Sequence, residues 1–138
     1  MRPGDIYAYA GPTVENPTNE PAVLDSAEAV GLPSSVRVTR IATLFPPLFS
    51  NGSFPFTGVN QRFRTARFRP LPGTVVPPGK PQAPGLQEIV FFLSPSVPGV
   101  YVTSGVWVSY HIGPKRYRYF EPARWALCVR PAKCPAWA

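Results

Sequence analysis

Acidic side chains and histidine are scarce in this chain, and both shortages restrict the chemistry that it can perform. The 138 residues include seven Asp and Glu and a single histidine, His111. None of these carboxylates lies in a GxSxG or HExxH motif, and no second histidine or spaced acidic pair is present for general acid–base catalysis. One histidine and two cysteines are also too few for a four-ligand structural zinc site. We therefore expect a protein that is not an enzyme and needs no cofactor, with His111 at the rim of a strand.

Long apolar runs are missing as well. The longest, near residues 89–93 and 106–108, are far shorter than the roughly 20 residues that cross a bilayer. The first five residues carry one positive charge but no apolar segment typical of a signal peptide. This leaves two locations open: extracytoplasmic or membrane-anchored if an upstream leader was removed, and cytoplasmic otherwise.

Proline and glycine, in contrast, are abundant. Their 20 and 11 copies disfavour long helices, because an interior proline costs a helix about 3 kcal/mol. Short strands joined by proline-rich loops tolerate this composition better. A length of 138 residues with 44% hydrophobic residues is sufficient for one domain with its own core. We predict a single domain over residues 1–138.

The clearest strand signal lies in the C-terminal third. Apolar residues fall at every second position from Val106 to Ile112, and the rhythm resumes with Tyr117 and Tyr119 after a Gly113-Pro114 break. Alternation on both sides of such a break is typical of an antiparallel hairpin. Val106, Val108, Tyr110, Leu127 and Val129 are therefore predicted to be buried together.

Similar patterns, with turn signals between them, divide the rest of the chain into short segments. Strands are predicted over residues 6–14, 22–30, 36–44, 62–68, 86–93, 100–112, 115–120 and 124–129, with proline-rich loops near 45–60 and 71–85 and a short tail over 130–138. Many short strands without a helix indicate an all-β fold. We predict an immunoglobulin-like antiparallel β-sandwich of about 7–9 strands.

Two stretches carry a resemblance to a known group of domains. Residues 15–24 form a polar turn followed by a Pro-started strand, and a Gly31-Leu32-Pro33 corner comes after it. The pattern from Gly105 to Tyr117 resembles the last strands of the same group. The chain is similar in these respects to small immunoglobulin-like domains of actinobacterial envelope proteins. The resemblance implies an envelope location and assigns no functional residues.

The two cysteines, Cys128 and Cys134, have five residues between them. We expect a local disulfide that holds the C-terminal tail. Two reduced structural thiols, or a metal or redox site, remain alternatives at this point.

Charge is unevenly distributed along the chain. Residues 1–31 hold five acids and one base, and residues 32–138 hold two acids and thirteen bases, so the net charges of −4 and +11 sum to +7. The bases gather in two strands, which makes Arg62, Arg64, Arg67, Lys115, Arg116 and Arg118 candidate binding residues. Arginine side chains that alternate with aromatic side chains can bind the phosphates of a nucleic acid and stack on its bases. The alternative is a solvent-exposed sheet face or edge whose charges prevent aggregation.

Aromatic residues are also concentrated in the predicted loop over residues 45–60. Phe49, Phe54 and Phe56 are candidate binding residues there. They either cap an open end of the sandwich or present an apolar patch to a partner.

These features predict a non-catalytic interaction or structural module with a protein partner or an anionic cell-surface component. The alternative is binding of nucleic acid or another polyanion through the arginine-rich strands.

Overall fold

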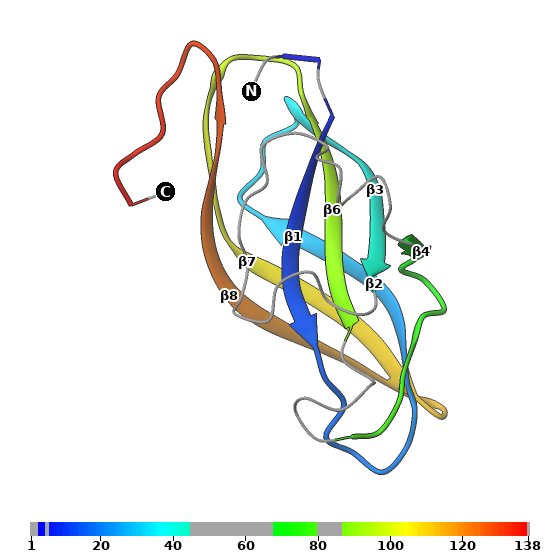
Figure 1. The fold of residues 1–138 in the computed structure, drawn as a ribbon. Helices are drawn as coiled ribbons and strands as arrows, with labels where there is room; N and C mark the ends of the chain where they lie inside the picture. Colours follow the sequence, from blue (N-terminus) through cyan, green and yellow to red (C-terminus); the bar gives the residue numbers. More distant parts are fainter. Residues whose placement is uncertain (1–2, 5, 45–67, 80–86, 138) are drawn as a thin grey trace.

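Eight strands run through residues 3–4, 6–44, 68–79 and 87–137, the part of the chain that the computed structural model describes (Figure 1). They are β1 (Tyr7–Val14), β2 (Ala22–Val30), β3 (Val36–Leu44), β4 (Phe68–Pro70), β5 (Val75–Val76), β6 (Gln87–Pro95), β7 (Gly99–Ile112) and β8 (Lys115–Val129). The predicted loop near 45–60 and most of the predicted strand over 62–68 lie outside the described residues.

The strands form two antiparallel sheets that face each other. The first sheet has the order β1-β6-β3-β4, and the second has the order β5-β2-β7-β8. The chain crosses between the sheets after β1, β2, β4, β5 and β6, so most pairings are long-range. In Figure 1, the layer of β1, β6 and β3 lies against the layer of β2, β7 and β8. The prediction of an all-β antiparallel sandwich is confirmed.

The core lies between the two inner faces and follows the alternation seen in the sequence. Val106 and Val108 of β7 are fully buried, and Leu127 and Val129 of β8 join them in one apolar cluster. Tyr110, which was predicted to be buried with them, packs against the same cluster but is only partly buried, because it lies near the hairpin end of β7. The first sheet contributes a second set of buried side chains: Tyr9, Val36, Ile89, Phe91 and Leu93.

The hairpin between β7 and β8 has a two-residue loop, because Ile112 pairs with Lys115. Gly113 occupies the first loop position with a φ of +55°. Glycine at that position suits a type II′ turn, whose twist matches the flanking strands. The Gly-Pro break in the sequence is therefore a tight hairpin turn.

The predicted strands over 6–14, 86–93 and 100–112 differ from β1, β6 and β7 by one or two residues at their ends, and two other predictions differ in the strands themselves. Residues 115–120 and 124–129 belong to one strand, β8, which continues through Pro122. This is possible because β8 is at the end of its sheet, where a proline without an N–H breaks no ladder on its outer side. The predicted loop over 71–85 also contains the short strand β5, which pairs with β2.

Candidate functional site

Only three of the candidate binding residues fall within the described part of the chain. Phe49, Phe54, Phe56, Arg62, Arg64 and Arg67 lie outside it. Lys115, Arg116 and Arg118 lie at the start of β8, and all three are exposed. The candidate site therefore comprises the start of β8 and its neighbours in the second sheet.

An ion-pair cluster covers the outer face of the second sheet near the hairpin. His111 Nδ1 lies 2.8 Å from Asp25 Oδ1, and Arg116 Nη1 lies 3.6 Å from Asp25 Oδ2. The β2–β7 register shifts between Leu24 and Ser26, which makes Asp25 the bulged residue. Bulges commonly redirect a side chain, and this one places a carboxylate between a histidine and an arginine.

One step along the same face, aromatic and basic side chains pack together. The Arg118 guanidinium lies 4.1 Å from the ring centre of Trp107, and Arg118 Nη2 lies 3.8 Å from Glu28 Oε2. Phe120 pairs with Trp107 across the strands, with ring centres 5.2 Å apart. We call Trp107, Phe120, Arg116 and Arg118, with His111, Asp25 and Glu28, the aromatic–arginine face.

The acids beside these arginines come from the acidic N-terminal part of the sequence. Glu88 is not one of these acids, because it is fully buried in β6 of the other sheet. Asp25 and Glu28 lie next to the arginines because β2 pairs with β7. Charges that are segregated along the chain thus balance in space on this face.

The C-terminal tail folds back along the second sheet. Cys128 at the end of β8 and Cys134 form a disulfide, as predicted, with their Cα atoms 5.4 Å apart. The Arg124 guanidinium lies 4.1 Å from the ring centre of Trp137, which gives the tail a second attachment to β8. Figure 1 shows the tail turning back beside that strand.

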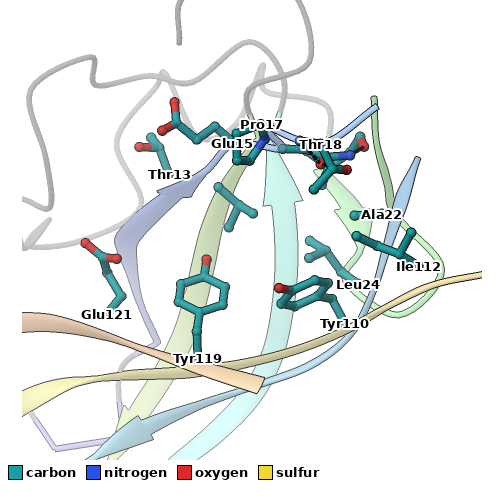
Figure 2. A pocket seen from close by; sticks show the side chains of 13 residues that line it. Thr13, Glu15, Pro17, Thr18, Ala22, Leu24, Tyr110, Ile112, Tyr119 and Glu121 are labelled. Atoms are coloured by element: carbon teal, nitrogen blue, oxygen red, sulfur yellow. Dashed lines mark hydrogen bonds between the residues drawn. The ribbon is translucent and has the colours of Figure 1, made fainter. Parts of the chain in front are cut away.

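A cavity of about 520 Å³ opens between the sheets at the end where β1 leads into β2. Its walls come from the end of β1, the connection to β2, and the hairpin halves of β7 and β8 (Figure 2). Leu24 and Val76 lie at its buried side, whereas Glu15 and Glu121 are exposed at its mouth. We call this space the end cavity.

Burial and the acidic surroundings of the end cavity both change the pKa of Tyr119. Burial raises the pKa of its phenol well above the ordinary value of 10, and the negative charges of Glu121 and Glu15 raise it further, together with Tyr110. Both carboxylates therefore act on the same hydroxyl. In Figure 2, Glu121 lies beside Tyr119, and the Tyr119 hydroxyl points toward the side of the cavity where Glu15 lies.

Sequence reasoning missed the end cavity, although part of its signal was present. The alternation that placed Tyr117 and Tyr119 on one face of the strand puts Glu121 on the same face two residues later. The contribution of Glu15 depends on β1 lying near β8, which no local pattern reveals.

Within residues 3–4, 6–44, 68–79 and 87–137, no three His, Cys, Asp or Glu side chains lie closely enough together to hold a metal ion. In the same segments, no helix has the length and apolar character needed to cross a bilayer.

Comparison with known proteins does not assign the chain to a family. No protein-family model, no curated protein and no solved structure matches the chain.

Proposed function

We propose that this chain is a non-catalytic, immunoglobulin-like binding module that works outside the cytoplasm and binds a protein partner. Its contact surface in this proposal is the aromatic–arginine face. The observation that carries the proposal is the packing of Arg118 on Trp107 beside Phe120, on an exposed sheet face.

The composition of this face supports a protein partner. Aromatic residues and arginine are enriched in protein–protein interfaces and dominate their energetic hot spots. Trp107 is half-buried and Phe120 is 37% exposed, so their rings present apolar area that a partner can cover. The paired charges of Asp25 and Glu28 provide a polar surrounding with directional contacts.

The disulfide supports a location outside the cytoplasm. Disulfides persist in oxidising compartments and are rare in reducing ones. The Cys128–Cys134 bond is consistent with the envelope location implied by the resemblance to actinobacterial domains. The Gly31-Leu32-Pro33 corner of that resemblance joins β2 to β3, where the chain passes from one sheet to the other.

Binding to a polyanion is the second candidate, favoured by the exposed bases at the start of β8. Lys115, Arg116 and Arg118 could contact phosphates of a nucleic acid or an anionic cell-surface polymer. Two of the three already have a carboxylate within 4 Å, which lowers the positive potential of the face. We therefore place the protein partner first.

Site-specific photo-crosslinking tests the proposed surface. We expect p-benzoylphenylalanine in place of Phe120 to give a discrete protein adduct in the cells that make this chain. The matched control carries the same residue at Val38, which is 40% exposed in the first sheet. Equal labelling from both positions, or none from position 120, would contradict the proposed surface.

A salt-dependent binding measurement separates the two candidates. If the chain binds DNA or heparin at about 50 mM salt, and Arg116→Glu with Arg118→Glu abolishes that binding, the polyanion function replaces the protein partner. For the location, thiol alkylation followed by mass spectrometry of protein from native cells should show no alkylated Cys128 or Cys134 before reduction.

A further inference from the structure

The end cavity is lined by carboxylates that packing of the core does not require. In a chain of net charge +7, the two charged residues that line this cavity within the described part of the chain are both acidic, Glu15 and Glu121. Glu121 is on the inward-facing phase of β8, the same phase as the core residues Trp125 and Leu127. A carboxylate at such a position contributes no apolar burial.

Polarity changes from the inside of the end cavity to its mouth. Leu24 and Val76 are at most 1% exposed and give the inner part an apolar surface. The rings of Tyr110 and Tyr119 form an aromatic corner, with centres 5.9 Å apart and planes at 69°. The two carboxylates come last, next to solvent. Figure 2 shows both glutamates on the same side as the Tyr119 hydroxyl.

The wall formed by the connection between β1 and β2 is held in place before any ligand arrives. The buried Asn16 amide donates to the carbonyls of Glu20, at 2.6 Å, and Val76, at 3.0 Å. Its side-chain oxygen accepts from both the backbone N–H and the hydroxyl of Thr18. A wall fixed in this way lowers the ordering cost of binding.

We propose that the end cavity is a binding site for an organic cation, with an aliphatic portion against the apolar inner part and an ammonium group between Glu15 and Glu121. The volume of about 520 Å³ falls within the roughly 300–1,000 Å³ of small-ligand sites. Carboxylates form their strongest hydrogen bonds with charged N–H donors, and tyrosine faces attract cations. Burial is the main cause of the raised pKa of Tyr119, and Glu121 and Glu15 add to it; the negative charges that disfavour a phenolate there favour a nearby cation.

The site is separate from the aromatic–arginine face, which lies on the outer side of the same sheet. An aliphatic ammonium can come from a free amine or from a lysine side chain of a polypeptide, and the experiment distinguishes these two sources.

Titration monitored by amide NMR shifts of the full chain tests the proposal. Hexylammonium serves as the free amine and Nα-acetyl-lysine methylamide as the side-chain mimic. We expect saturable shifts at Glu15, Tyr110 and Tyr119. Glu15→Gln combined with Glu121→Gln should weaken binding about tenfold or more, because two charge-assisted contacts are lost. Glu28→Gln is the matched control, since that carboxylate is exposed on the outer face, outside the cavity.

Each outcome bears on the proposal directly. Binding of hexylammonium alone assigns the site to free amines, and binding of both probes extends it to lysine side chains. Absence of saturable shifts with either probe overturns the proposal. It is equally overturned if hexanol binds as tightly as hexylammonium, or if Glu28→Gln weakens binding as much as the double change. Unchanged amide shifts far from the cavity establish that the double variant is folded.

Discussion

The guanidinium of Arg118 stacks on the indole of Trp107 at 4.1 Å, although the two residues are not direct partners in the β7–β8 ladder. Trp107 pairs with Phe120, and Arg118 pairs with Ser109. The contact is therefore diagonal across the two strands. Because the direct partner of Arg118 is the small Ser109, the arginine side chain can extend over the indole. Diagonal neighbours in a sheet are within reach of long and aromatic side chains.

A double-mutant cycle on Trp107→Ala and Arg118→Ala should give a coupling of about 0.5–1 kcal/mol in the free energy of unfolding, the usual size of an exposed cation–π contact. Urea denaturation measures it. The comparison cycle pairs Arg118→Ala with Glu28→Ala and should give a coupling of a few tenths of a kcal/mol that disappears in high salt. Additivity of the Trp107 and Arg118 changes would contradict the stacking contact.

Replacing Cys128 and Cys134 together by serine should lower the free energy of unfolding by about 2 kcal/mol. The bond closes a short loop, and the entropic gain from such a loop is modest. Reducing agent should lower the stability of the natural chain by the same amount and leave the double serine variant unchanged. Equal stability of the oxidised and reduced chains would remove the stabilising role assigned to this bond.

The features that sequence reasoning recovered are those set by local alternation. The bounds predicted for residues 22–30 and 36–44 coincide with β2 and β3. The inward phase of β7 follows directly from apolar residues at every second position. Period-two burial needs no knowledge of which strands are neighbours, and for that reason it was visible.

The features that were missed depend on neighbours far apart in the sequence. His111 and Asp25 are 86 positions apart and meet only because β2 pairs with β7 and bulges at Asp25. A bulge leaves no clear local mark in a segment that otherwise alternates. The predicted basic surface was incomplete for this reason, since the acids that balance Arg116 and Arg118 belong to a different strand.

Tyr119 should make stability depend on pH in alkaline solution. Its phenol has a raised pKa in the folded chain, whereas the unfolded chain should titrate near the ordinary value of 10. Above that pH the unfolded chain binds fewer protons than the folded one, so the free energy of unfolding falls as pH rises, by at most about 1.4 kcal/mol per pH unit for this group. Tyr119→Phe should therefore lose stability less steeply above about pH 10.

Urea unfolding between about pH 8 and 11 tests this expectation around the ordinary tyrosine pKa. Tyr117→Phe is the matched control, because Tyr117 is 42% exposed on the same strand and should leave the alkaline slope of the natural chain unchanged. Parallel stability curves for the natural chain and Tyr119→Phe would show that this phenol is not responsible.

Gly105 marks a close approach between β7 and β8. A Cβ added there would lie 2.5 Å from the carbonyl oxygen of Glu121 and closer still to the Phe120 ring, which covers the glycine. The backbone oxygen cannot move away without disturbing the ladder, so Gly105→Ala should destabilise the fold by about 1–3 kcal/mol, as overpacking does. Ser104→Ala, at the exposed neighbouring position, should have little effect.

Adding Phe120→Ala to Gly105→Ala separates the two contacts. The smaller side chain relieves the overlap with the ring but leaves the overlap with the Glu121 carbonyl, so we expect the double variant to recover only part of the loss in a double-mutant cycle. Full recovery would mean that the strands can separate locally and that the ring alone excludes a side chain. Because Glu121 also lines the end cavity, the remaining strain should weaken hexylammonium binding in the Gly105→Ala variant, whereas Ser104→Ala should bind as the natural chain does.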